Sequence, residues 1–296
     1  MTAGINTPIL VLHPQADNLD LLVKNCLEPN IYNTYILDAF LSIASSHSLN
    51  NYPIHIKFNT GLNRLGFNEN DVEILGSKLK NNSSVKIESI FSHLAASEDE
   101  NEEEFTLSQI SSFEKISTQF NQVFGFLPNR HMTNTSGILN YPQAHYDMVR
   151  LGIGLFGFGN SKKETENLKN TLTLSSIISQ IHLVKKGDSV GYNRDFFSVK
   201  PMKIATIPIG HADGVSRKLG NGIGHVKINN QKAIIIGNVC MDMIMADISD
   251  IKCKEGDHVI IFDNQEMVEE MALNSGTISY ELLTALSQRI RRIILK

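Results

Sequence analysis

The feature that most constrains the fold is an alternation of strand-like and helix-like segments in the first half of this 296-residue chain. Helical spacing occurs in LDAFLSIASSHSL (37–49) and EFTLSQISSFEKISTQFNQVF (104–124). The strand-like segments are PILVL (8–12), TYILD (34–38), IHIKF (54–58), KIESIFSH (86–93), RHMTNTS (130–136) and VRLGIGLFGF (149–158). Strands that alternate with helices form a parallel sheet, either doubly wound or closed into a barrel.

The pattern of apolar and turn-forming residues changes after about residue 165. Short strand-like runs are then broken by Gly, Asn and Asp, as in ISQIHLVKKGDSVGY (178–192), MKIATIPIG (202–210), GHVKINNQKAIIIGNV (224–239) and DHVIIF (257–262). The last segment, 279–296, has helical propensity at its start and a basic, strand-like end. We therefore predict an α/β domain over 1–165 and a mostly antiparallel β domain over 166–296.

Composition excludes several classes of partner. A net charge of -4, with dispersed basic residues, provides no positive electrostatic field that would attract a nucleic acid. The three cysteines are odd in number and far apart, which indicates reduced thiols and a cytoplasmic protein. Apolar runs such as AIIIGNVCMDMIM (233–245) end well before the ~20 residues that span a bilayer, and the amino terminus has no basic flank typical of a signal peptide.

Polar residues at the ends of successive strands favour the barrel over the doubly wound sheet. In a (β/α)₈ barrel the carboxyl ends of the strands form the active-site face, and the loops after the last two strands often hold a phosphate. TNTSG (133–137) and RLGIG (150–154) offer hydroxyl and backbone N–H groups for such a role. The polar strand-end residues are Lys57, Arg64, Ser92, His93, Asn134, Thr135, Arg150 and Gly152.

Eight motifs, in order, resemble those of the bacterial alanine racemases, which are fold-type III pyridoxal-phosphate enzymes. The motifs are IKFNTGLNRLGF (56–67), FSHLAAS (91–97), TNTSG, DMVRLGIGLFG (147–157), VGYNRDF (190–196), IPIGHADGVSR (207–217), GNVCMDM (237–243) and ISYELL (278–283). The resemblance implies interconversion of L- and D-alanine for peptidoglycan synthesis by a homodimer with shared active sites. The motifs are also similar to the racemase half of chains in which a muramoyl-tripeptide ligase precedes the racemase.

The resemblance implies a role for each strand-end residue. Arg64 would lie beside the phenolic oxygen of the cofactor and the substrate carboxylate. Lys57 matches a lysine that many members carry as a carbamate, which would anchor Arg64; without the resemblance, a lysine reaching solvent is the better interpretation. Asn59 stands where the family usually has Asp, so one anchoring charge is expected to be missing.

Arg150 resembles the arginine that faces the pyridine nitrogen of the cofactor, where a guanidinium that keeps its proton weakens the ring as an electron sink. His131 resembles the histidine that orients this arginine, and His93 the one beside the cofactor ring. Any one of these residues alone would more often be structural. The phosphate would be bound by Thr135, by the backbone N–H groups of Gly152 and Ile153 and by Tyr280, and Asn134 would also belong to the cofactor site.

The later motifs imply the remaining roles. Tyr192 matches the acid/base tyrosine, and Met241 the residue whose backbone helps to hold the substrate carboxylate. Asp242 follows Met241, and His211 stands where the family often has a tyrosine lining the entry channel. In the family, the residues matching Tyr192 and Met241 reach the barrel of the partner subunit.

One family feature has no match in this chain. The lysine that forms a Schiff base with the cofactor lies in a segment resembling Lys-Ala-Asn-Ala-Tyr-Gly-His, which does not occur here. GINTPILVL (4–12) resembles the third barrel strand of the family, so we expect a barrel lacking its first two strands and an impaired racemase. A late start codon, a split gene and a truncation would all give this sequence. The alternative is a non-catalytic cofactor-binding remnant or a dimerising partner module.

Overall fold

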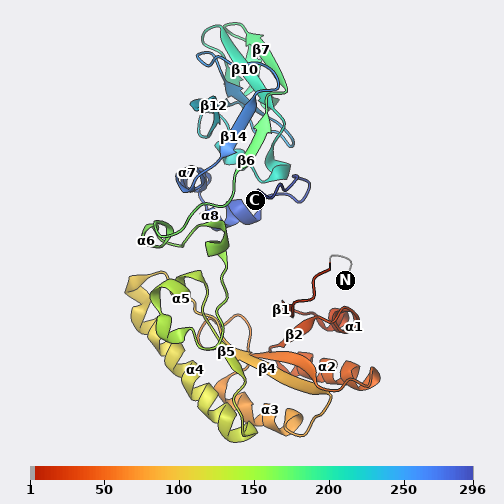
Figure 1. Ribbon diagram of the computed structural model, residues 1–296. Helices are drawn as coiled ribbons and strands as arrows, with labels where there is room; N and C mark the ends of the chain where they lie inside the picture. Colours follow the sequence, from red (N-terminus) through yellow and green to blue (C-terminus); the bar gives the residue numbers. More distant parts are fainter. Residues whose placement is uncertain (1–3, 296) are drawn as a thin grey trace. The chain divides into compact units, whose positions relative to one another are not determined.

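The structure is a computed structural model that describes residues 4–295. The chain divides into two compact units. Unit 1 comprises Met1–Gly152 and Gly159–Glu164, and unit 2 comprises Ile153–Phe158 and Thr165–Lys296 (Figure 1). Among residues 4–295, no helix is long and apolar enough to cross a membrane.

Unit 1 contains a sheet of five parallel strands in the order β1-β2-β3-β4-β5. Each strand pairs with its predecessor in the chain, whereas a doubly wound sheet reverses its order at a switch point. The winding is therefore that of a β/α barrel, which confirms the predicted fold class for this part of the chain. The strands are β1 (Leu10–Val11), β2 (Glu28–Ile31), β3 (Tyr52–Lys57), β4 (Val85–Phe91) and β5 (Asn129–His131).

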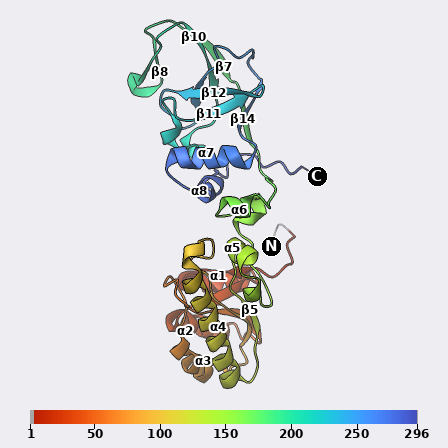
Figure 2. The same ribbon diagram turned by 90° about the vertical axis from the view of Figure 1, so that its left-hand side faces the viewer.

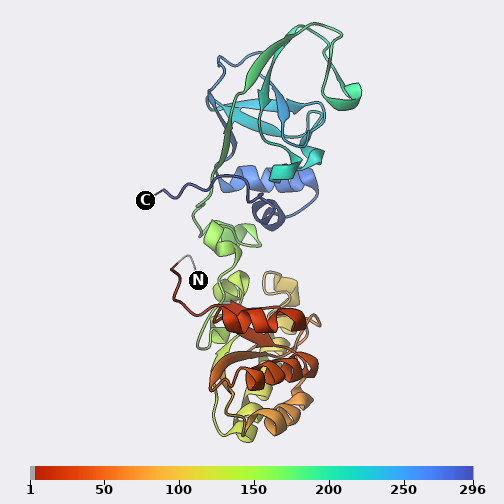
Figure 3. The same cartoon turned by 90° about the vertical axis from the view of Figure 1, so that its right-hand side faces the viewer.

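Four helices, α1 to α4, pack on one side of this sheet, where apolar side chains of the strands meet apolar helix faces (Figures 1 and 3). Ile54 and Ile56 from β3 and Phe113 and Phe120 from the long fourth helix are almost fully buried in this core. Alternate residues of the strands then face the other side of the sheet. The helices are α1 (Leu19–Lys24), α2 (Thr34–Ser46), α3 (Val72–Leu79), α4 (Glu103–Phe124), α5 (Thr135–Asn140) and α6 (Lys162–Thr165).

Two of the six strands predicted in the first half of the chain are wrong. Residues 34–38 form the first turns of α2, because the Asn33 side chain accepts from the backbone N–H of Ile36 at 2.8 Å and caps the helix. The strand at this point is β2 instead. Residues 149–158 contain only a 3₁₀ turn, Ile153–Phe156, and Gly157 follows with φ +86° in the left-handed region.

Unit 2 is built on a seven-stranded antiparallel sheet in the order β6-β14-β11-β12-β13-β10-β7, with a separate β8-β9 hairpin (Figures 1 and 2). This confirms the predicted antiparallel β domain. The predicted strand-like end is wrong, because the described residues after 284 form no strand. The elements are β6 (Leu174–Ile177), β7 (Gln180–Val184), β8 (Ser189–Val190), β9 (Phe196–Phe197), β10 (Met202–Ile207), β11 (His225–Ile228), β12 (Gln231–Ile236), β13 (Ile244–Asp247), β14 (His258–Phe262), α7 (Gln265–Ser275) and α8 (Ser279–Thr284).

Candidate active site

The carboxyl ends of the strands in unit 1 border a pocket of about 410 Å³. Three of the lining side chains are the cations Lys57, Arg64 and Arg150, and none of the described lining residues is Asp or Glu. Such a pocket favours an anionic ligand. The lining residues are Leu12, His13, Lys57, Arg64, Leu65, Phe91, His93 and Arg150.

Arg64 lies in a loop that is closed back onto β3. The backbone N–H of Asn59 donates to Phe67 at 2.8 Å, and the N–H of Phe67 donates to Lys57 at 2.9 Å. Gly66, with φ +130°, permits this closure, because a Cβ there would lie 2.6 Å from the Asn59 nitrogen. Inside the loop, the Asn59 side chain accepts from the backbone N–H of Asn63 at 2.9 Å. Asn59 thus shapes the loop that carries Arg64.

Lys57, at the end of β3, is almost fully buried, with 7% of its surface exposed. Its ammonium lies 5.9 Å from the centre of the Phe91 ring. Burial, with repulsion from Arg64 and Arg150, lowers the pKa of Lys57 to about 8. At pH 7 most of this side chain is therefore still the ammonium, and the uncharged amine becomes the major form only above about pH 8.

Arg150 is held by a set of acceptors at the ends of β4 and β5. Its Nη2 donates to the carbonyl of Ser92 at 2.7 Å and to Nδ1 of His93 at 3.0 Å. Its Nη1 bonds to Nδ1 of His131, and its guanidinium lies 5.1 Å from the centre of the Phe91 ring. Arginine only donates, so both histidine Nδ1 atoms accept and both rings are neutral.

The electrostatics of the two histidines agree with that assignment. Burial, then the charge of Arg150, lowers the pKa of His93 to about 4 and that of His131 to about 2. Burial also lowers the pKa of Arg150 to about 10, which leaves it charged at neutral pH. The arrangement fixes a guanidinium, and not a proton-exchanging group, at the edge of the pocket.

The predicted phosphate residues of unit 1 lie together but are bonded to other groups of the protein. The backbone N–H of Gly152 donates to Oγ1 of Thr135 at 3.1 Å. The side-chain oxygen of Asn134 caps α5, accepting from the N–H of Gly137 and the hydroxyl of Ser97, each at 2.8 Å. Asn134 therefore has a structural role in the chain.

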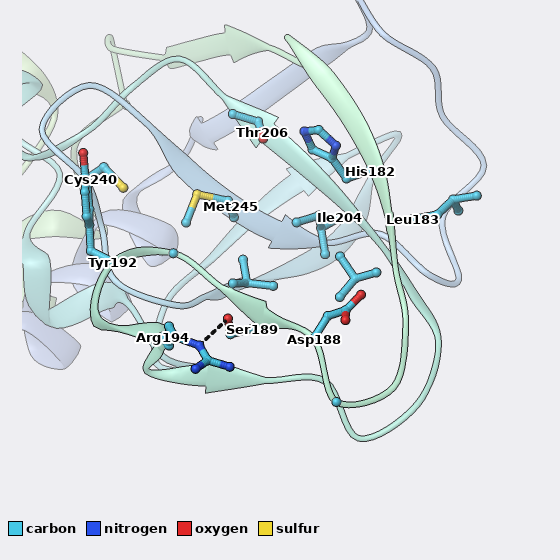
Figure 4. Close-up of a pocket in the computed structure, with 14 residues that line it drawn as sticks. His182, Leu183, Asp188, Ser189, Tyr192, Arg194, Ile204, Thr206, Cys240 and Met245 are labelled. Carbon is cyan, nitrogen blue, oxygen red and sulfur yellow. Dashed lines mark hydrogen bonds between the residues drawn. The ribbon is translucent and has the colours of Figure 1, made fainter.

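Tyr192 and Met241 lie in unit 2 and are exposed, with 73% and 60% of their surfaces accessible. Tyr192 lines an open pocket of about 820 Å³ together with Cys240 and Met245 (Figure 4). The tip of the β8-β9 hairpin is fixed beside it, because Arg194 donates to the Ser189 hydroxyl at 3.1 Å. Tyr192 is thus held on an ordered turn with its ring accessible.

An ion-pair cluster that the sequence did not predict holds the segment after Met241. Arg289 donates to Asp242 at 2.5 Å and to both oxygens of Asp213, at 2.6 and 3.0 Å. Asp213 also accepts from the backbone N–H of Gly210 at 2.9 Å. Asp242 therefore acts within unit 2 to fix this segment.

The other predicted site residues of unit 2, His211, Ile153 and Tyr280, lie in three different structural environments. The backbone N–H of His211 donates to the carbonyl of Cys240 at 3.0 Å, and the His211 side chain is exposed. Ile153 is buried in the apolar core of unit 2. Tyr280 lies in α8 with 36% of its surface exposed.

Comparison with known proteins gives a consistent result over most of the chain. The family "Alanine racemase, N-terminal domain" matches residues 1–159, and "Alanine racemase, C-terminal domain" matches residues 171–294. The alanine racemase of Sorangium cellulosum is 32% identical over 98% of this chain and 79% of its own length.

Two solved structures show the same fold. The alanine racemase of Clostridium difficile 630 superposes with a TM-score of 0.90 at 29% identity, over 97% of this chain and 76% of its own. The alanine racemase of Bartonella henselae, with covalently bound pyridoxal phosphate, has a TM-score of 0.81 at 26% identity, over 99% of this chain and 80% of its own.

Proposed function

Because this chain belongs to the alanine racemase family, we propose that it provides the cofactor pocket and the acid/base tyrosine for the interconversion of L- and D-alanine in peptidoglycan synthesis. The family uses pyridoxal phosphate. We assign the cofactor-binding domain to residues 1–165 and the second domain to 166–296. The three free cysteines support a cytoplasmic location.

The pocket of unit 1 fits pyridoxal phosphate. The cofactor brings a phosphate and a phenolic oxygen, and the pocket offers three cations and no lining carboxylate among the described residues. When bound, pyridoxal phosphate withdraws electrons from the α-carbon of an amino acid and makes its hydrogen acidic. Arg150 would face the ring nitrogen as a fixed donor, with His93 beside the ring and His131 behind the guanidinium.

We assign binding of the cofactor phosphate and of the substrate carboxylate to the remaining predicted residues. Thr135, Tyr280 and the backbone N–H groups of Gly152 and Ile153 would serve the phosphate, and Asn134 would belong to the cofactor site. The substrate carboxylate would be bound by Arg64 and by the backbone of Met241, with His211 near the entry. Lys57 would anchor Arg64, and the low pKa of Lys57 supplies the neutral amine that forms a carbamate with carbon dioxide.

Inversion needs a proton removed from one face of the α-carbon and another delivered to the opposite face. Tyr192 would move the proton on one face, and its exposure in the chain supports a site completed by a second copy. The family's cofactor-binding lysine would act on the other face, and no segment of this sequence matches its motif. We therefore propose that the 296-residue chain alone is impaired as a racemase. We also propose that it corresponds to the racemase half of a protein in which a muramoyl-tripeptide ligase precedes the racemase.

The observation that carries the proposal is Arg150, charged and held by two neutral histidines in a cationic pocket. A titration of the 296-residue chain with pyridoxal phosphate, followed by absorbance, tests it. Arg150→Lys loses the forked set of bonds, and we expect its Kd to rise about tenfold, since one such interaction is worth about 1.4 kcal/mol.

Arg130→Lys is the matched control. Arg130 pairs with Glu114 and stacks on Tyr146 outside the pocket, so its replacement should leave the cofactor Kd unchanged. Equal affinity in all three proteins would contradict the assigned pocket. A remnant without catalysis would bind the cofactor in the same way, but would stay inactive when an amino-terminal segment carrying the family's lysine motif is joined ahead of residue 1.

A further inference from the structure

The hydrogen bonds of Arg150 are extended by a series of side chains on the face of the sheet opposite the helices. Nε2 of His131 lies 2.9 Å from the Ser89 hydroxyl, and that hydroxyl lies 2.6 Å from Nδ1 of His55. Nε2 of His55 then lies 2.7 Å from a carboxylate oxygen of Glu28. Four neighbouring strands, β5, β4, β3 and β2, thus contribute one side chain each to a continuous path.

The path is shielded along most of its length. His131, Ser89 and His55 have 0%, 2% and 7% of their surfaces exposed. Only the Glu28 end reaches a different pocket, lined also by Cys26 and Tyr52, near the amino-terminal ends of β2 and β3. Unpaired polar groups at such depth are costly, so the hydrogens along the path are expected to be fully matched to acceptors.

Both ends of the path fix the direction of its hydrogen bonds. Arg150 only donates, so Nδ1 of His131 accepts and its Nε2 carries the hydrogen, which it donates to Ser89. The Ser89 hydroxyl then donates to Nδ1 of His55, and Nε2 of His55 donates to the carboxylate of Glu28, which only accepts when ionised. Both histidines are neutral in this arrangement and every hydrogen has an acceptor.

A doubly protonated His55 would break this pattern. Its Nδ1–H would donate to Ser89, whose oxygen would then accept from both histidines. The Ser89 hydroxyl hydrogen would be left without an acceptor on the path, in a site with 2% exposure. The one-way arrangement is therefore the favoured state.

A β-bulge places Ser89 in the path. The pairing of β3 with β4 runs Ile54 to Ile87 and then shifts, so that His55 pairs with Ser89 and Glu88 is the extra residue. Without the shift, His55 would face Glu88 and Ser89 would point towards the helices. Bulges of this kind re-aim single side chains.

We propose that Glu28, His55 and Ser89 are positioning residues that fix the tautomer of His131 and thereby the orientation of the Arg150 guanidinium. If Nδ1 of His131 carried the hydrogen, two N–H groups would face each other and Arg150 would turn away. The direction of the path is a property of the chain alone. Its consequence for cofactor binding rests on the proposed function.

The test is ¹⁵N NMR of the histidine side chains in the 296-residue chain without cofactor. Two-bond ¹H–¹⁵N spectra distinguish protonated from unprotonated ring nitrogens, and His55→Gln and His131→Gln assign the signals. We expect both histidines to be neutral and protonated on Nε2. Glu28→Gln removes the charge at the end of the path and should shift the His55 Nε2–H proton upfield, with a smaller shift at His131.

Ser89→Ala cuts the path and should change the His131 tautomer signals and broaden the resolved Nη signals of Arg150. Glu88→Gln is the control, since Glu88 pairs with exposed Lys86 and should leave both histidines unchanged. A His131 protonated on Nδ1, or unaltered His55 signals in Glu28→Gln, would overturn the proposal. The response of the His55 signals to Glu28→Gln still tests the proposal if the Ser89→Ala variant fails to fold. Because no cofactor is present, neither outcome depends on the proposed function.

Discussion

At the residue scale, the chemistry of the pocket depends on three cations that lie close together without a lining carboxylate. Their mutual repulsion is offset by hydrogen bonds to carbonyl and imidazole acceptors, and burial lowers the pKa values of Lys57 and Arg150. Arg150 keeps its charge and bonds to carbonyls and imidazoles, whereas Lys57 has its pKa lowered to about 8. Lys57 is therefore the residue whose charge state responds to conditions.

This gives a prediction on stability and pH. The folded chain releases the Lys57 proton near pH 8, and the unfolded chain retains it up to its ordinary value of 10.5. Between these values the unfolded state binds more protons, so the free energy of unfolding gains a component that rises with pH. Lys57→Met removes the component and the burial of charge, and should raise stability at pH 7 by about 2 kcal/mol.

Urea denaturation at pH 7 and pH 9, in buffer depleted of carbon dioxide, measures this difference. Lys80→Met, at an exposed position of the same unit, is the control and should show no such gain. The advantage of Lys57→Met over the parent should shrink at pH 9. An advantage that is equal at both pH values would show that the ammonium is not disfavoured in the pocket.

At this scale the strand-end pattern in the sequence predicted part of the pocket, and Ser92, Asn134, Thr135 and Gly152 are not among its lining residues. Lys57, Arg64, His93 and Arg150 lie in one pocket, and their roles towards the cofactor stay predictions. The path through His55 and Ser89 was not predicted. It depends on a one-residue bulge, and periodicity in the sequence does not reveal where pairing between strands shifts.

At the scale of elements, the loop from β3 to Phe67 is the most constrained part of the pocket. Gly66→Ala would place a methyl group 2.6 Å from the backbone of Phe58 and Asn59, at a φ of +130°. We expect a loss of about 2 kcal/mol or more, and a loop that no longer holds Arg64. Urea denaturation measures the loss.

Gly125→Ala is the matched control for that substitution. Gly125 also has a positive φ, +79°, at the end of α4, but a Cβ there would meet no atom within 4 Å. Its replacement should cost only about 1 kcal/mol, the backbone penalty alone. Equal losses at the two positions would mean that loop closure on β3 adds nothing to the cost at Gly66.

The cap of α5 gives a second prediction at this scale. Asn134→Ala removes the acceptor for Gly137 and Ser97 and should lower stability by about 1–2 kcal/mol without any cofactor present. Asn134→Asp keeps an acceptor oxygen and should retain most of the stability. Thermal unfolding of the three proteins checks this; an unaffected Asn134→Ala would leave cofactor binding as the better account of this residue.

Elements with strong periodicity were the easiest to predict. The 22-residue α4 matches the predicted helix 104–124 to within one residue. The segment 34–38 was misassigned, because a short apolar run fits a strand or a buried helix equally well and the Asn33 cap decides between them. Residues 149–158 are apolar, but their glycines favour turns over a strand.

At the scale of the whole molecule, the strand–helix alternation and the antiparallel second half were predicted from the sequence, and the winding of the five strands agrees with a barrel. The sharing of active sites between two copies is a proposal that rests on the exposure of Tyr192 and Met241. It leads to a complementation experiment in the chain extended with the family's lysine motif.

Tyr192→Phe and Arg150→Ala should each inactivate the extended protein. If one copy provides Tyr192 and the other Arg150, a mixed dimer has one intact site and one doubly altered site. Mixing the variants through unfolding and refolding should therefore restore roughly a quarter of the parental activity, because about half of the dimers are mixed. Activity that stays absent after mixing would place both residues of each site in the same copy.

The most direct measurement is D-alanine formation from L-alanine with pyridoxal phosphate, comparing the 296-residue chain with the extended chain. The account predicts turnover by the extended chain, a fall of at least about a hundredfold in its Tyr192→Phe variant, and no activity of the 296-residue chain above cofactor alone. Robust turnover by the 296-residue chain would contradict the account, because a group other than the missing lysine would then act opposite Tyr192.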